Sequence, residues 1–146
     1  MKNAIFTILL GGAFALLSTA EAHAQCRSFT KRTCMTQLEG YIQNDNYNSA
    51  ILIPGDEAEL MLTFLAGQDY RLVVCSHPIL GDIEYQILDA AGATLYSSEK
   101  ASEDRDYVDF KVQTTQQLLV QISVPASDAA ILHEGCVTVL VGSKAD

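Results

Sequence analysis

Two short stretches of this 146-residue chain place a cysteine near a histidine, and both side chains are common zinc ligands. One residue separates Cys75 from His77, and two residues separate His133 from Cys136. If the two stretches met, two thiolates and two imidazoles could hold a tetrahedral zinc ion. The chain would then be a small metal-dependent enzyme that uses His77 and His133. In an oxidising compartment, however, the cysteines would be disulfide-bonded and the histidines would lie in surface loops. We therefore expect no catalytic residue, no metal and no cofactor.

A run of carboxylates between residues 99 and 109 is the second candidate for chemistry. It could supply an acid–base pair for glycoside hydrolysis, or calcium ligands, with Asp104 and Asp106 as the ligands. The Asn-rich segment 44–48 also resembles the start of a calcium loop, but it lacks the glycine and the distal glutamate of an EF-hand. Clustering in one charged segment is more typical of a solvated loop, which is our prediction. The members of the run are Glu99, Glu103, Asp104, Asp106 and Asp109.

The first 24 residues have the pattern of an export signal. Lys2 precedes an uncharged apolar run over residues 4–17, and Ala22-His23-Ala24 is a small-x-small cleavage site. The run is shorter than the roughly 20 residues that a membrane-spanning helix needs. A lipid anchor on Cys26 is the alternative, but Gln25 precedes that cysteine where a small residue is expected. We predict a processed chain that begins at Gln25, is secreted or periplasmic, and keeps no integral membrane segment.

All four cysteines lie in the predicted processed chain, and an even number in a small exported domain favours two disulfides. If Cys26 and Cys34 lie on one helix, they are about 12 Å apart, beyond the reach of a disulfide. This favours pairing of each with Cys75 or Cys136, which would attach the N-terminal segment to the rest of the domain. The connectivity between the two pairs stays open.

The segment 25–48 is predicted to hold the one helix, over residues 28–42, and a loop. Ser28 or Thr30 could cap the helix start. An apolar stripe at helical spacing is formed by Cys34, Leu38, Tyr41 and Ile42. Three basic residues form a patch that could bind an anionic partner or simply be a solvated helix face, and we favour the solvated face. They are Arg27, Lys31 and Arg32.

Residues 49–146 show short alternating apolar runs separated by turn signals. Residues 59–75 contain two of these runs, joined by a polar turn at Gly67, and predict a central hairpin. The chain has no helical pattern between strands, which excludes parallel α/β folds. We predict a single all-β domain, an antiparallel β-sandwich of about eight strands that is jelly-roll-like, with the N-terminal helix in front.

Two motifs in this part of the chain carry a resemblance to a known family. One is an apolar strand, Pro54-Gly55-Asp56, a second apolar strand and then residues 67–70, Gly-Gln-Asp-Tyr. The other is Ile-Leu-Asp-Ala-Ala-Gly-Ala-Thr-Leu at residues 87–95. Together these motifs resemble the bacterial pre-peptidase C-terminal domain, a β-sandwich family. The resemblance covers residues 49–141 and implies a non-catalytic accessory or binding role. The N-terminal cysteine-bearing helix departs from the family, and the overall arrangement resembles small uncharacterised secreted bacterial proteins.

The formal net charge of -9 makes nucleic acid and anionic membranes poor partners. We therefore expect a non-catalytic module that binds a protein or a carbohydrate outside the cytoplasm, with a structural envelope or extracellular protein as the alternative. Exposed aromatic rings on one sheet face would favour a glycan, but for each candidate ring we favour a partly buried position in the core or at its rim. The candidate rings are Tyr47, Tyr96 and Tyr107.

Overall fold

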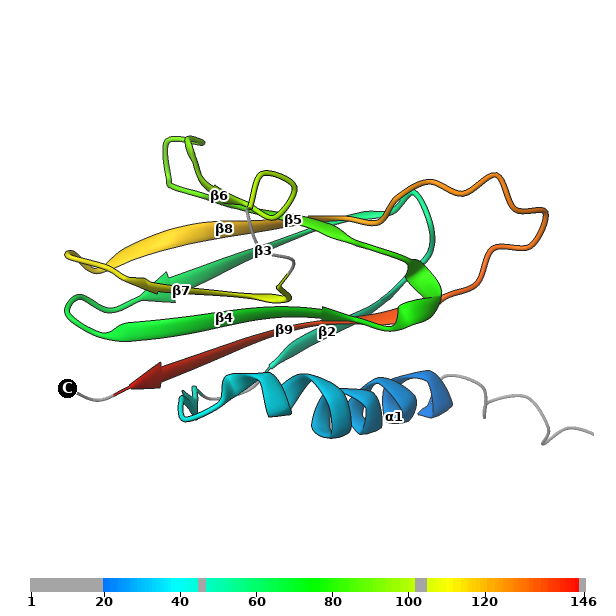
Figure 1. Cartoon of the computed structure of the whole chain (residues 1–146), viewed down its shortest axis with the longest axis horizontal. Helices are drawn as coiled ribbons and strands as arrows, with labels where there is room; N and C mark the ends of the chain where they lie inside the picture. The colour runs from blue at the N-terminus through cyan, green and yellow to red at the C-terminus, as the bar shows by residue number, and fades with distance from the viewer. Residues whose placement is uncertain (1–19, 45–46, 102–104, 145–146) are drawn as a thin grey trace, which may run out of the picture.

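The computed structural model describes residues 20–44, 47–101 and 105–144 of the chain. Two antiparallel sheets pack face to face, and a helical segment lies under one of them (Figure 1). The prediction of an all-β antiparallel sandwich with one N-terminal helix is therefore confirmed. Nine strands, rather than about eight, occur in the described part of the chain.

The five-stranded sheet has the order β1-β9-β4-β7, and β2 pairs with the same edge of β9 as β1. Its central strand β4 is buried on both faces, since one face meets the core and the other meets the helical segment. The strands are β1 (Ile42–Gln43), β2 (Asn48–Leu52), β4 (Asp69–Ser76), β7 (Tyr107–Lys111) and β9 (Gly135–Lys144).

The four-stranded sheet has the order β3-β8-β5-β6. Along β5, Tyr85 and Ile87 are buried in the core while Glu84 is exposed, as the alternation predicted. Burial raises the pKa of the Tyr85 hydroxyl well above its ordinary value. The strands are β3 (Glu57–Phe64), β5 (Glu84–Leu88), β6 (Thr94–Ser97) and β8 (Gln116–Ser123).

The predicted central hairpin over residues 59–75 is wrong. β3 pairs with β8 in the four-stranded sheet, whereas β4 pairs with β7 and β9 in the five-stranded sheet. The turn at Gly67 crosses from one sheet to the other, and the Gly67 amide donates to the Val112 carbonyl at 2.9 Å. Alternating apolar residues show which side chains face the core, but they do not show which strands pair. Two strands bury the same alternate side chains whether they pair within one sheet or lie in opposite sheets across the core.

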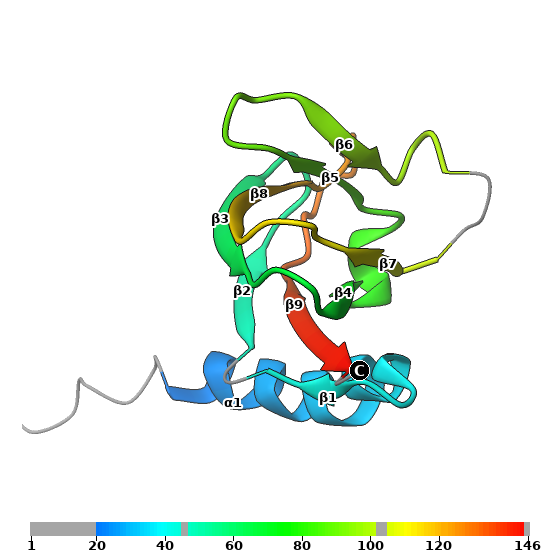
Figure 2. The same ribbon diagram turned by 90° about the vertical axis from the view of Figure 1, so that its left-hand side faces the viewer.

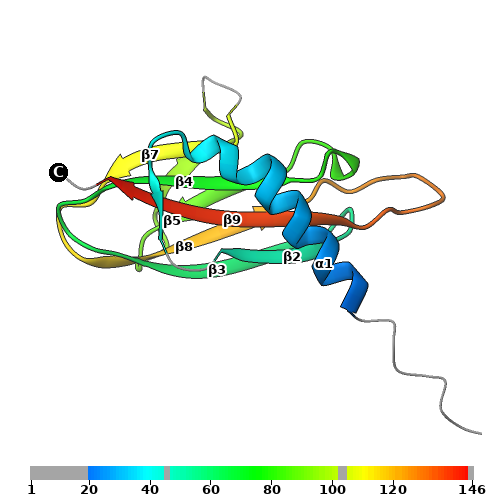
Figure 3. The same ribbon diagram turned by 90° about the horizontal axis from the view of Figure 1, so that it is seen from below.

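The helical segment comprises α1 (Ala20–Phe29), a π-helical turn η1 (Thr30–Cys34) and a 3-10 turn η2 (Met35–Leu38). Figures 2 and 3 show it lying across the outer face of the five-stranded sheet. It starts and ends earlier in the chain than the predicted helix over residues 28–42, so neither Ser28 nor Thr30 caps its start. Ile42 belongs to β1 and is 73% exposed, so it is not part of the apolar stripe.

Residues 1–19 of the predicted export signal lie outside the described residues, and cleavage after Ala24 stays a prediction. Within the part of the chain that the structure describes, no helix has the length and apolar character needed to cross a bilayer.

Two disulfides attach the helical segment to the five-stranded sheet. Cys26 bonds to Cys136 on β9, with 5.4 Å between their Cα atoms, and Cys34 bonds to Cys75 on β4, with 5.7 Å. This confirms that each N-terminal cysteine pairs with one of the two later cysteines. Thr30 lies between the two bridges, and its hydroxyl is 2.8 Å from that of Thr138.

Arg71 on β4 joins the end of the helical segment to the sheet. Only 8% of this residue is exposed, and its guanidinium forms two 2.7 Å hydrogen bonds with the Asp109 carboxylate. Nη1 donates to the Gln37 carbonyl at 2.9 Å, which satisfies a group at the helix end. The guanidinium carbon lies 3.9 Å from the Tyr107 ring centroid and 4.8 Å from that of Tyr41. Hydrogen bonding to Asp109 raises the pKa of Arg71 above its ordinary value.

Candidate functional site

The loops at one end of the sandwich, at the right of Figure 1, form the candidate binding surface. We define this loop end as residues 53–57, 77–84 and 125–135. They include the β2–β3 turn, the 3-10 turn η3 (Pro78–Leu80) and the long loop between β8 and β9. Figures 1 and 3 both show the long loop extending beyond the two sheets, at the end opposite the C-terminus.

Both ends of the long loop are held in place. At its start, Gly55 donates to the Val124 carbonyl at 3.0 Å, and the Val124 amide donates to the Asp56 carbonyl at 2.9 Å. At its far end, the His77 amide donates to the Cys136 carbonyl at 2.8 Å, and Cys136 is bonded to the helical segment. Backbone hydrogen bonds therefore fix the long loop where it leaves the sandwich, at Val124, and where it re-enters it, at Cys136.

Close packing adds to this anchoring at Gly135. A Cβ atom at Gly135 would lie 2.7 Å from Cγ of Leu80, so β9 approaches η3 as closely as only glycine permits. Leu80 is buried, whereas its neighbour Ile79 points to the surface and is 45% exposed.

The loop end gathers apolar side chains in an exposed position. Ile131 is 71% exposed and Leu132 is 46% exposed, both on the long loop, and Ile53 on the β2–β3 turn is 40% exposed. With Ile79, the loop end holds four of the eight large apolar side chains that are exposed among the described residues. Scattered apolar residues need no explanation, but several on loops at one end of the sandwich make that end a candidate interaction surface.

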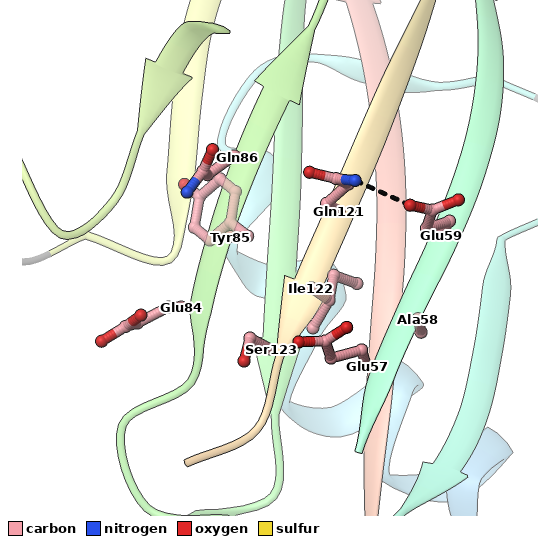
Figure 4. Close-up of a pocket in the computed structure, with 9 residues that line it drawn as sticks. All are labelled: Glu57, Ala58, Glu59, Glu84, Tyr85, Gln86, Gln121, Ile122 and Ser123. Atoms are coloured by element: carbon pink, nitrogen blue, oxygen red, sulfur yellow. Dashed lines mark hydrogen bonds between the residues drawn. The ribbon is translucent and has the colours of Figure 1, made fainter. Parts of the chain in front are cut away.

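The outer face of the four-stranded sheet is a second open surface, and it is polar and acidic. Figure 4 shows its shallow depression of about 270 Å³ between β3, β8 and β5. Gln121 donates to the Glu59 carboxylate at 2.6 Å, and Glu57 and Glu84 flank Ser123 at the end nearer the loop end. Among the described residues that line the depression there is no lysine or arginine to balance its carboxylates.

The residues of the zinc alternative are not arranged as a metal site. Cys75 and Cys136 belong to different disulfides, and no described cysteine is free. The His77 ring accepts a hydrogen bond from the Ile79 amide at 3.3 Å and lies 5.5 Å from the Phe29 ring, and His133 is exposed on the long loop. Among the described residues, no three His, Cys, Asp or Glu side chains are grouped so that they could hold a metal ion.

Of the two candidate calcium ligands, Asp104 lies outside the described residues. Asp106 accepts a 3.1 Å hydrogen bond from Gln37, and its carbonyl accepts one from Val74 at 2.7 Å. Glu99 and Asp109 are exposed, and Asp109 is engaged by Arg71. Asp106 and Asp109 therefore contact protein groups that join the helical segment and β4.

The three candidate tyrosines do not share one platform. Tyr47 and Tyr107 pack against the cluster under the helical segment, and the Tyr107 ring lies against Arg71. Tyr96 belongs to the other sheet and packs against Tyr85, with 5.5 Å between ring centroids. Glycan binding through these rings stays a prediction, but all three are partly buried parts of a core.

The basic patch of Arg27, Lys31 and Arg32 is exposed on the helical segment. Sequence reasoning recognised this patch but missed the apolar loop end. The signal for the loop end was the pair Ile131-Leu132 inside a segment with no strand pattern, because consecutive apolar residues in a long loop have no sheet face to bury.

The sequence matches no protein-family model and no curated protein. In three dimensions the chain is similar to PliG of Aeromonas hydrophila, a periplasmic inhibitor of g-type lysozyme, with 10% sequence identity and a TM-score of 0.51. The match covers 73% of this chain and 90% of the PliG chain. A de novo designed double-stranded β-helix also matches, at 14% identity over 68% of this chain and 99% of its own, but its TM-score of 0.33 supports no argument. The PliG match establishes a shared fold.

Proposed function

We propose that the processed chain is a non-catalytic module that acts outside the cytoplasm by binding a protein through the loop end. The observation that carries this proposal is the exposure of Ile131 and Leu132 on a loop that is pinned at both ends. An apolar loop whose ends are fixed loses less conformational entropy on binding than a free loop, and so retains more of its contact energy as affinity. Ile131 and Leu132 would insert into an apolar recess on the partner.

The fold bears on the protein-binding role, and the disulfides bear on the compartment. The fold is shared with PliG, which is described as an inhibitor of a lysozyme, and this makes a g-type lysozyme the first partner to test. The resemblance to the pre-peptidase C-terminal domain stays a prediction, and it implies the same kind of accessory role. The two disulfides accord with a life in an oxidising compartment.

The test is a binding and inhibition experiment with the chain purified after export. Titration into a g-type lysozyme should give a one-to-one complex with a Kd of about 1 µM or tighter, and lysis of peptidoglycan should slow. The double substitution Ile131→Ser and Leu132→Ser should weaken binding at least about tenfold, since two anchors are lost. Leu95→Ser removes an apolar side chain that is 56% exposed on β6, and it is the matched control that should bind normally. Absence of binding by the unmodified chain would contradict the proposal.

A further inference from the structure

The loop end carries charge of only one sign. Its three segments contain six carboxylates and no lysine or arginine. Five of the six are exposed, and the sixth, Asp56, is half-buried and accepts a 2.9 Å hydrogen bond from the Ile53 amide. The exposed five are Glu57, Asp82, Glu84, Asp128 and Glu134.

None of these five carboxylates takes part in an ion pair among the described residues. Among the described residues, the ion pairs formed by Arg71 and Lys111 involve other acids, namely Glu39, Asp109 and Asp69. Glu57 and Glu84 extend the acidic surface onto the open face of the four-stranded sheet, as Figure 4 shows. Arg105 lines a hollow together with Asp82 and Glu84. Asp128 and Glu134 lie on the same loop as Ile131 and Leu132 and form no ion pair among the described residues.

Like charges that are packed around an apolar patch disfavour most partners. A neutral or acidic protein that covered Ile131 and Leu132 would bring further negative charge near the carboxylates, or would desolvate them without compensation. A cationic surface gains attraction at contact and also at a distance, because a field of one sign steers oppositely charged partners towards it. The charge therefore selects among the proteins that the apolar tips could bind.

We propose that the partner of the loop end is a cationic protein with an apolar recess. Ile131 and Leu132 enter the recess, while Asp128 and Glu134 on the same loop meet lysine or arginine side chains at its rim. This inference rests on the proposed function and adds the chemistry of the partner. An anionic membrane would be repelled by the same carboxylates.

A second copy of the chain is the competing occupant that the molecule itself suggests. The exposed patch of Arg27, Lys31 and Arg32 on the helical segment is cationic and could contact the loop end of a neighbour. That contact would be head-to-tail and would generate open chains, since the two surfaces differ. Sedimentation of the purified chain separates the two cases.

The experiment uses a g-type lysozyme of net positive charge, in its native form and after succinylation, which converts lysine ammonium groups into carboxylates. Association and dissociation rates are measured by biolayer interferometry at several salt concentrations. We expect the native probe to bind, the succinylated probe to bind at least about tenfold more weakly, and the association rate to fall about tenfold between low and high salt.

Two matched variants assign the effect to the loop end. Asp128→Asn with Glu134→Gln should lower the association rate about fivefold and leave the dissociation rate nearly unchanged, as expected for rim charges. Glu39→Gln with Asp69→Asn removes the same number of charges at the opposite end of the sandwich and should have little effect. The side chains of Glu39 and Asp69 are 74% and 43% exposed, so neither substitution threatens folding.

The outcomes separate the two proposals. Equal binding of native and succinylated probe, without salt dependence, overturns the cationic partner but leaves the protein-binding role standing. Binding of neither form contradicts the proposed function and this inference with it. Self-association of the chain that disappears in the Ile131→Ser and Leu132→Ser variant assigns the loop end to a second copy, and also overturns the inference.

Discussion

The outer faces of the two sheets differ in how they meet water. The five-stranded sheet is covered by the helical segment, which is attached by two disulfides, by Arg71 and by close packing on β9. The four-stranded sheet leaves its outer face open, and Glu57, Glu59 and Glu84 line it. Stability should therefore depend strongly on the covered face and weakly on the open one.

The helical segment, which is the cover of the five-stranded sheet, also changes the burial pattern along the strands. From Arg71 to Cys75 every residue of β4 is buried, because the two faces of the strand pack against different neighbours. β3 alternates along its length, with Glu59 exposed and Phe64 buried in the core. A continuous buried run and a clean alternation are thus the signatures of a covered and an open sheet.

The largest effect on stability should come from removing the disulfide between the helical segment and β4. Cys34→Ala with Cys75→Ala should lower the free energy of unfolding by about 4 kcal/mol, because the bridge closes a long loop in the unfolded chain. Their sequence separation is 41 residues. Urea unfolding followed by circular dichroism gives the value. A loss below about 1 kcal/mol would show that the cover contributes little and would remove the contrast between the faces.

Close packing of the cover on β9 should give the next largest effect. In Gly142→Ala the new Cβ would lie 2.8 Å from Cβ of Tyr41 and 2.9 Å from Cδ2 of Leu38, so the chain after η2 must shift. We expect a loss of about 2 kcal/mol, as for overpacked cores. Ser123→Ala on the open sheet is the control and should change the free energy of unfolding by less than about 0.5 kcal/mol.

Arg71→Lys should have a smaller effect on the same side of the molecule. Lysine keeps the charge but loses the paired hydrogen bonds to Asp109 and the stacking against Tyr107, and we expect a loss of about 1 kcal/mol. Arg32→Lys, on the exposed helix surface, should leave the unfolding curve unchanged. Equal curves for both variants would mean that Arg71 acts only as a point charge.

The smallest effect is expected on the open face. Glu84→Gln removes one exposed carboxylate from the acidic surface, and the free energy of unfolding should change by no more than about 0.5 kcal/mol. Thermal unfolding by circular dichroism measures it. A large change would reveal that the open face is engaged in structure after all, and the contrast between the sheets would need revision.

Much of the fold could be predicted because its signals are local. The short alternating apolar runs over residues 49–146 predicted strands that bury alternate side chains, as Tyr85 and Ile87 do on β5. Spacing along a helix also predicted that Cys26 and Cys34 would pair with later cysteines rather than with each other.

The errors have physical causes. The pattern of β3 and β4 carries no information on whether they pair or face each other across the core, since both arrangements bury the same alternate side chains. The helix start was missed because residues 20–24 were assigned to the export signal. Its end was missed because Tyr41 and Ile42 continue the apolar helical spacing, although the helical segment ends at Leu38 and Ile42 belongs to β1.

The sequence by itself determined which alternate side chains of the strands are apolar and how unevenly charge is distributed along the chain. It also determined that Cys26 and Cys34 are too far apart on a helix to form a disulfide. Only the tertiary structure decided that three loops remote in sequence meet at one end, with Ile79 near Gly135 and Gly55 bonded to Val124. The reason is that side-chain periodicity is a property of neighbouring residues, whereas strand pairing and loop clustering depend on contacts between residues far apart in the chain.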